Sequence, residues 1–172
     1  MKSPFLIIKL GLFVLGLTLF SCGIEAEEIQ LYECRSGKCT YTFFTSQQIE
    51  IVEDTVDNLA FVNIIEGNNL VFLYRYIADS GSNANENDYD EDIFFEIDPT
   101  LNSFSFTDEQ LAETKISIKP WCLCGSIVIE PDQGSLRGER LNDNTWEISF
   151  EATYQLNNET KEISFKAKFA EP

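Results

Sequence analysis

The chain has 172 residues, with 29 acidic side chains against 12 basic ones and a formal net charge of −17. This excess of negative charge argues against nucleic acid as a partner and against adsorption to anionic lipid, because both would repel the protein. Its long-range attraction would favour cationic partners or divalent metal ions, and the alternative, which we favour, is that the charge serves solubility. The absence of histidine excludes Ser-His and Cys-His nucleophile pairs and the usual zinc hydrolase sites, so any catalysis would depend on carboxylates, tyrosine or lysine.

The N-terminal segment has the organisation of a secretory signal. Lys2 and Lys9 precede an uncharged apolar run over residues 10–20, which is shorter than the roughly 20 residues of a membrane-spanning helix. Residues 1–21 are therefore expected to be a helical signal peptide that is cleaved. We expect residues 22–28 to form a tether and residues 29–172 to form a single domain.

The segment LFSC, residues 19–22, ends this apolar run. Leu19, Ser21 and Cys22 match the lipobox of bacterial lipoproteins, which the segment resembles, whereas Phe20 occupies a slot that usually holds a smaller residue. The resemblance implies that Cys22 is acylated and anchors an outer-membrane lipoprotein in the bacterial cell envelope. The acidic residues that follow resemble the tract that directs some lipoproteins to the cell surface. The alternative is an ordinary signal with an incidental cysteine.

Four further cysteines, an even number in an exported domain, indicate disulfides. A bond between Cys122 and Cys124 would close a strained ring around one residue. We therefore expect two long-range bridges, each joining Cys34 or Cys39 to Cys122 or Cys124. Each would stabilise the fold by up to about 4 kcal/mol in the chain-entropy account. A four-cysteine zinc site is the alternative.

Residues 32–43 read YECRSGKCTYTF. They resemble the opening strand of bacterial lipoprotein lysozyme inhibitors, which are small β-barrels that begin with a similar Tyr-x-Cys. The resemblance implies an inhibitor of basic enzymes such as lysozyme. It covers about a dozen residues, and the later active-site loop of those inhibitors is not visible in this sequence.

Short runs rich in β-branched and aromatic residues follow one another along the chain, with turn-forming clusters between them. Residues 59–65 and 70–77 alternate poorly and are expected to be central strands covered on both faces. The helical candidate is residues 107–114, one or two turns capped by Thr107 or Asp108. Residues 145–156 and 162–169 alternate strictly around the turn NNET, which predicts an antiparallel hairpin with one dry face.

About eight to ten short strands predict an all-β fold, a single antiparallel β-sandwich or β-barrel. Tyr74 and Tyr76 would line a cavity if the strands closed into a barrel.

The acidic segment over residues 79–92 is the first candidate site. Asp88, Asp90 and Asp92 alternate, so in an extended chain their carboxylates would share one side and repel one another. Either a calcium ion or water would relieve this repulsion. The glycine and glutamate of an EF-hand loop are missing, and no other cofactor is indicated.

Two further candidate binding sites lie nearer the C-terminus. Trp121, beside two cysteines, is either a surface aromatic for a sugar or peptide or, as we favour, a core residue that packs over a disulfide. Arg137 and Arg140 either pair with nearby carboxylates, which we favour, or clamp an anionic ligand.

These features together predict a lipid-anchored, non-catalytic binding or interaction module. Its expected partners are the membrane, through the anchor, and a cationic protein or an envelope glycan, with no nucleic acid. The alternatives are the inhibitor of basic enzymes and a small glycan-acting enzyme that works through two carboxylates.

Overall fold

The computed structural model describes residues 34, 37–54, 56, 59–79, 89–121 and 127–172. Nine strands and one short 3-10 helix are found among these residues, which confirms the all-β prediction. The predicted signal peptide and tether lie outside the described residues. In chain order the elements are β1 (Gly37–Asp54), β2 (Leu59–Glu66), β3 (Asn69–Ala78), β4 (Asp90–Ile97), β5 (Ser103–Thr107), η1 (Asp108–Thr114), β6 (Ser117–Trp121), β7 (Gln133–Asn142), β8 (Thr145–Leu156) and β9 (Glu159–Ala170).

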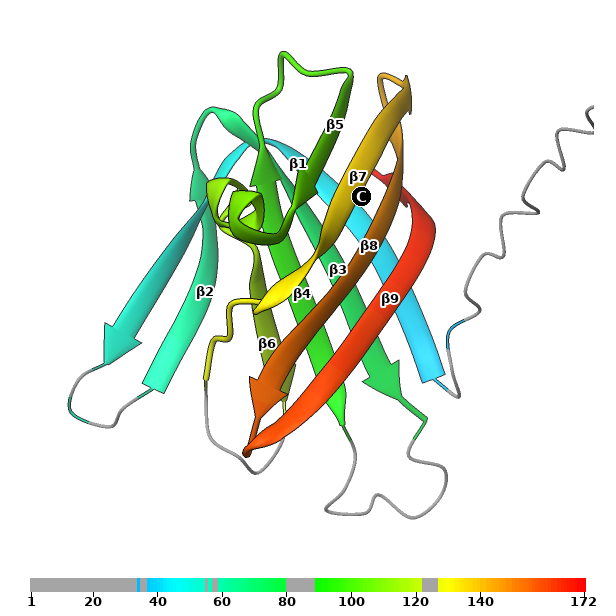
Figure 1. Cartoon of the computed structure of the whole chain (residues 1–172). Helices are drawn as coiled ribbons and strands as arrows, with labels where there is room; N and C mark the ends of the chain where they lie inside the picture. Colours follow the sequence, from blue (N-terminus) through cyan, green and yellow to red (C-terminus); the bar gives the residue numbers. More distant parts are fainter. Residues whose placement is uncertain (1–33, 35–36, 55, 57–58, 80–88, 122–126) are drawn as a thin grey trace, which may run out of the picture.

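All nine strands belong to one sheet in the order β5-β7-β8-β9-β1-β3-β4-β6, with β2 paired to β1 beside this path. Neighbouring strands are antiparallel except β9 and β1, which run parallel at the pair Thr42 and Ala170, so the sheet is mixed. Figure 1 shows the sheet folded on itself, with β5, β7, β8 and β9 in front of β1, β3, β4 and β6. The end strands β5 and β6 do not pair within the described residues. The fold is therefore sandwich-like and not closed.

The predicted C-terminal hairpin is present as β8 and β9. The two strands pair without interruption from Thr145 with Ala170 to Leu156 with Glu159. Asn157 and Asn158 connect them with positive φ values of 54° and 63°, as a tight hairpin turn between twisted strands requires. The apolar side chains face inward at every second position, as the sequence predicts.

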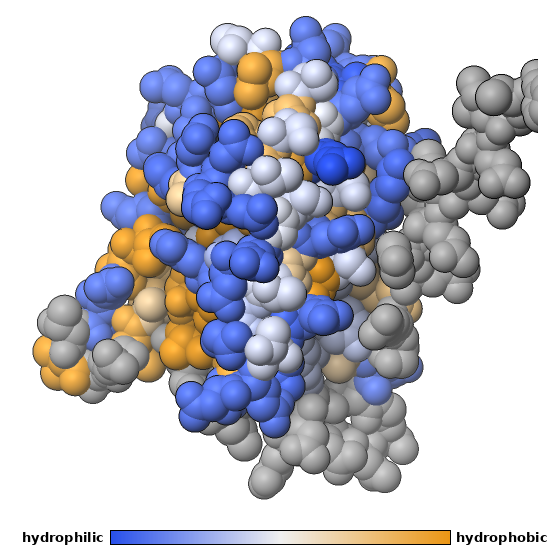
Figure 2. Space-filling model, in the orientation of Figure 1, coloured by the Kyte–Doolittle hydropathy of each residue, from blue (hydrophilic) through white to orange (hydrophobic). Residues whose placement is uncertain are grey.

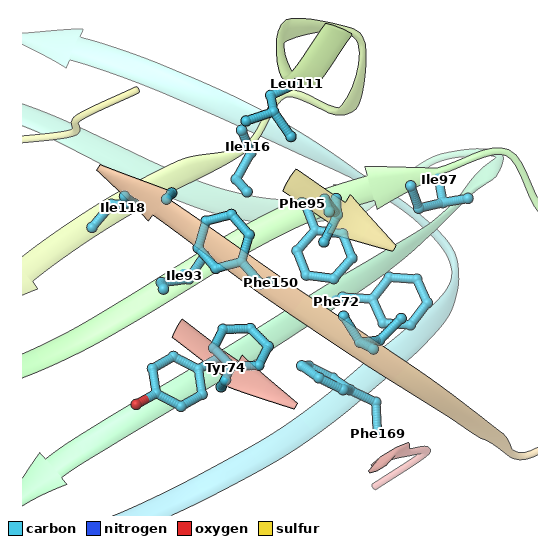
Figure 3. Close-up of a cluster of buried hydrophobic side chains, with 14 of the residues drawn as sticks. Phe72, Tyr74, Ile93, Phe95, Ile97, Leu111, Ile116, Ile118, Phe150 and Phe169 are labelled. Carbon is cyan, nitrogen blue, oxygen red and sulfur yellow. The ribbon is translucent and has the colours of Figure 1, made fainter. Parts of the chain in front are cut away.

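An aromatic cluster fills the space between the two layers. The Phe72 ring of β3 stacks on Phe95 of β4 at 4.8 Å between centroids, and it meets Trp146 of β8 and Phe169 of β9 edge-on at 5.7 and 5.6 Å. None of these four side chains is exposed. Figure 3 shows Phe72, Phe95 and Phe169 converging from different strands. Such edge-on and offset contacts are the favourable geometries for aromatic pairs, so this cluster holds the layers together.

β1 bends halfway along its length. Ser46 has a φ of 56°, and the pairing register shifts between Phe44 and Gln47. Beyond the bend, β1 pairs with β2, and we call residues 47–66 the β1–β2 arm. The arm lies against the outer face of the sheet, where Ile49 packs with Val71 and Phe94.

The prediction of two central strands, each covered on both faces, has different outcomes for β3 and β2. β3 is buried on both faces over Leu70, Val71 and Phe72, as predicted, but Arg75 and Ile77 farther along it are exposed. For β2 the prediction is wrong, because this strand pairs only with β1 and its Phe61 side chain is 39% exposed. Figure 2 shows the hydrophobic surface that the arm presents at the left of the molecule.

The predicted helical turn is present as η1. Its seven residues form a 3-10 helix, and the side chain of Gln110 accepts a hydrogen bond from the backbone N–H of Thr107 at 3.2 Å. Thr107 is therefore the capping residue, one of the two that the sequence offered.

The predicted long-range disulfide pairing is wrong for the N-terminal cysteines. Cys34 and Cys39 bond to each other, with their Cα atoms 5.7 Å apart. The two cysteines are five residues apart in the sequence, so each has a local partner rather than one in a distant strand. Cys122 and Cys124 lie outside the described residues.

The local bridge has a measurable consequence for stability. Replacing Cys34 and Cys39 together by serine is expected to lower the free energy of unfolding by about 2 kcal/mol, because a short loop restricts the unfolded chain less than a long one. Urea unfolding under oxidising conditions would measure this loss. A loss of about 4 kcal/mol or more would instead point to bridges that span the domain.

Candidate functional site

A cavity of about 900 Å³ opens between the two layers of the sheet. Because alternate residues of a strand face the same side, Cys39 and Tyr41 of β1 and Tyr74 and Tyr76 of β3 reach it together. Tyr74 and Tyr76 thus line a cavity, although the barrel closure on which the sequence made this expectation depend is not present. We call this space the tyrosine cavity. Its inner wall includes Cys39, Tyr41, Tyr74, Tyr76, Tyr89, Glu91 and Phe165.

A buried carboxylate lies in the wall of the tyrosine cavity. Glu91 of β4 is 4% exposed. Its Oε2 atom accepts hydrogen bonds from the Tyr89 hydroxyl at 2.5 Å and the Tyr154 hydroxyl at 2.7 Å, and the two hydroxyl oxygens lie 3.0 Å apart. Oε1 accepts no hydrogen bond from the described residues. One carboxylate oxygen is therefore held by the protein while the other is left for a partner.

Burial shifts the ionisation of this cluster. Desolvation raises the pKa of Glu91 above the ordinary 4.5, although the hydrogen bonds from Tyr89 and Tyr154 oppose the shift. Desolvation, followed by the nearby charge of Glu91, also raises the pKa values of Tyr74, Tyr89 and Tyr154. The tyrosine hydroxyls consequently stay protonated and act as donors.

Two other hydroxyls belong to the same wall. Because Cys39 is in a disulfide, the Tyr74 hydroxyl is the donor to its Sγ atom, at 3.6 Å. Burial raises the pKa of Tyr41 as well, and its hydroxyl has no hydrogen-bond partner within the described residues. The Tyr41 ring is tilted against Tyr74 at 5.5 Å between centroids. The wall thus presents the Tyr41 hydroxyl beside the packed rings of Tyr41 and Tyr74.

The charged residues that line the tyrosine cavity, among those described, are all acidic. Besides Glu91, the residues that border it include the exposed acids Asp108, Glu151 and Glu162, and none of its described lining residues is lysine or arginine. A carboxylate that is desolvated and lacks a basic neighbour is the kind of perturbed group that marks functional sites.

Glu91 is expected to reduce the stability of the fold at neutral pH. Because its pKa is raised in the folded state, that state favours the protonated form, so wild-type stability falls as the pH rises from the ordinary value of 4.5 through this raised pKa and then levels off. Glutamine mimics the protonated form and keeps an oxygen for both tyrosines. E91Q should therefore be more stable than the wild type by about 1 kcal/mol near pH 7.5. The gain should shrink toward pH 4.5, as urea unfolding at several pH values would measure. Lower stability at every pH would contradict this assignment.

A second, outer groove of about 580 Å³ lies on the opposite face, between the β1–β2 arm and β6. Here the Arg75 guanidinium donates to both carboxylate oxygens of Asp92, at 2.7 and 2.9 Å, and Trp121 Nε1 donates to Oδ2 at 3.1 Å. The ammonium of Lys119 lies 4.2 Å from the Trp121 ring centroid, a cation–π contact. Trp121 is 50% exposed, so the core position favoured from the sequence is wrong.

The residues of the calcium prediction are only partly described, since Asp88 lies outside the described residues. Asp90 accepts a hydrogen bond from the backbone N–H of Ala78 at 2.9 Å, and Asp92 is the counter-ion of Arg75. Among the described residues, no group of three or more acids or cysteines is placed to hold a metal ion. The positive charge of Arg75 relieves the carboxylate repulsion that the sequence predicted for Asp92. Calcium binding by the loop stays a prediction.

Arg137 and Arg140 do not converge on one ligand. Both lie on β7, where Arg137 is exposed on the outer face and Arg140 faces inward, with its guanidinium carbon 5.1 Å from the Trp146 ring centroid. Neither forms an ion pair with a carboxylate among the described residues. The structure therefore brings together tyrosines and Glu91 rather than these two cations.

Comparison with protein-family models, with curated proteins and with solved structures finds no match to this chain. In the part of the chain that the structure describes, no helix has the length and apolar character needed to span a bilayer.

Proposed function

We propose that this chain is a lipid-anchored, non-catalytic binding module of the bacterial cell envelope that takes a small organic molecule into the tyrosine cavity. The cavity itself carries the proposal. Its volume of about 900 Å³ falls within the range of small-molecule sites, and it combines aromatic walls with a few placed polar atoms. The continuously paired β8–β9 hairpin and the packed aromatic core that border it suit a preformed site.

The anchor in this proposal is Cys22, on the basis of the lipobox resemblance. Acylation there would hold the domain at the membrane by a tether of a few residues. Labelling of cells with palmitate should mark the wild-type protein and place it in the membrane fraction. C22A should lose both the label and the membrane association, and retention of the label would remove Cys22 from this role.

Binding in the tyrosine cavity can be tested with a neutral probe. Titration of the purified chain with 1-N-phenylnaphthylamine should enhance the dye's fluorescence with a stoichiometry of one, because the dye leaves water for an apolar space. The variant A152F places a phenyl ring at a buried position of the cavity lining and should abolish the enhancement.

A matched control distinguishes the cavity from the remaining surface. A112F makes the same substitution at an exposed position of η1 and should bind the dye as the wild type does. Equal enhancement in A152F and the wild type would show that the dye binds elsewhere. Absence of enhancement in the wild type would overturn the proposed function.

A further inference from the structure

We infer that the molecule taken up by the tyrosine cavity is a small organic cation, an amine whose ammonium group pairs with Glu91 and whose apolar body packs on the tyrosines. This inference rests on the proposed function and names the ligand class of the same site.

The first argument is the position of the Glu91 carboxylate. Oε2 accepts the Tyr89 and Tyr154 hydroxyls, while Oε1 has no donor among the described residues. A carboxylate buried to this degree normally has a positively charged partner. The nearby acids Asp92 and Glu96 have such partners, since Arg75 pairs with the first and Lys115 with the second. Of these three buried acids, Glu91 alone lacks a cationic partner within the described structure.

The second argument is the selectivity that the wall imposes. An anionic ligand would meet Glu91 and the exposed acids at the border, with no lysine or arginine among the described lining residues to compensate. A neutral ligand would leave the buried carboxylate unpaired. An ammonium ion would donate to Oε1 with a charge-assisted hydrogen bond, and the net charge of −17 would attract it from a distance.

The third argument is the aromatic lining. Tyr41, Tyr74, Tyr76 and Tyr89 all reach the cavity, and a cation within about 6 Å of such a ring is attracted to its face. The Tyr41 hydroxyl, which has no hydrogen-bond partner among the described residues, offers an acceptor for a second ammonium hydrogen. The desolvation that raises the pKa of Glu91 also strengthens the attraction between its ionised form and a cation, because charges interact more strongly away from water. A bound cation would in turn lower this pKa.

Three probes with one carbon skeleton test the ligand class. We would measure displacement of 1-N-phenylnaphthylamine from the whole chain by 2-phenylethylamine, 2-phenylethanol and phenylacetate, which carry charges of +1, 0 and −1 near pH 7.5. The amine is expected to bind at least about tenfold more tightly than the alcohol, and phenylacetate most weakly. In E91Q the preference for the amine over the alcohol should fall to within about twofold.

A charge-matched control accompanies E91Q. E139Q removes one negative charge from an exposed position of β7 and should keep the wild-type preference. Equal affinity for amine and alcohol in the wild type would overturn the inference while dye binding still upheld the cavity. An unchanged preference in E91Q would remove Glu91 from the recognition of the cation. Failure of every probe, including the dye, would overturn the proposed function itself.

Discussion

Replacing Arg75 by methionine is expected to destabilise the fold by about 3 kcal/mol. The substitution leaves the carboxylate of Asp92, whose side chain is 2% exposed, with the N–H of Trp121 as its only side-chain hydrogen-bond donor among the described residues. Loss of one partner from a buried ion pair typically costs about 3 to 5 kcal/mol. We expect the lower end of this range because the Arg75 side chain is 46% exposed. Urea unfolding of both proteins would measure the loss.

A double-mutant cycle separates the ion pair from the packing of its side chains. D92N removes the charge that R75M leaves unpaired, so the double variant R75M/D92N should recover a substantial part of the stability lost in R75M. Additive losses in the two single variants would mean that Arg75 and Asp92 are not energetically coupled.

Replacing Phe72 by alanine is expected to lower the free energy of unfolding by about 4 kcal/mol. The Phe72 ring is fully buried and contacts Phe95, Trp146 and Phe169, which come from both layers of the sheet. Its removal forfeits the burial of the ring and leaves a cavity that rigid neighbours cannot fill. For a domain of this size the melting temperature should fall by roughly 8 to 16 °C.

Phe61 provides the matched comparison for Phe72. The same substitution, F61A, removes a ring from β2 that is 39% exposed, and it should cost about 1 kcal/mol or less. Thermal unfolding followed by circular dichroism would compare the two variants. Similar losses would contradict the assignment of Phe72 to the centre of the core and of Phe61 to an open surface.

The period-two pattern was sufficient to predict the hairpin of β8 and β9, because one face of each strand is buried and the other faces solvent. It failed for β2. The segment LAFVNII is apolar on both sides. Composition cannot distinguish a strand that is buried on both faces from one that is buried on a single face. Here the bend at Ser46 turns the arm outward, and Phe61 stays partly exposed.

The candidate site was only partly predictable. Tyr74 and Tyr76 share the phase of the buried Phe72 on β3, but this strand alternates poorly in sequence, so their place in a cavity was expected only if a barrel closed. Glu91 was missed because it lies in a run of acids that the sequence assigns to a solvent-exposed loop. The available signal was its phase with Ile93 and Phe95, since β4 begins at Asp90 rather than after Asp92.

The disulfide shows a different limit of prediction from spacing. The long-range pairing followed from rejecting a Cys122–Cys124 ring and from requiring every cysteine to be paired. Sequence spacing does not reveal which cysteines lie close together in the fold, and here Cys34 is bonded to Cys39, only five residues away. Cysteine spacing therefore leaves the connectivity open even when only three pairings exist.

The two tryptophans give the molecule two independent optical reporters. Trp146 is wholly enclosed between the layers, whereas Trp121 is half-exposed in the outer groove. In the variant W121F, the remaining indole should emit at short wavelength and shift to the red only when the layers separate. In the complementary variant W146F, the emission of Trp121 would report changes at the β1–β2 arm. It would respond little to a ligand in the tyrosine cavity on the opposite face. Emission spectra of these two variants would thus monitor each side of the sheet separately.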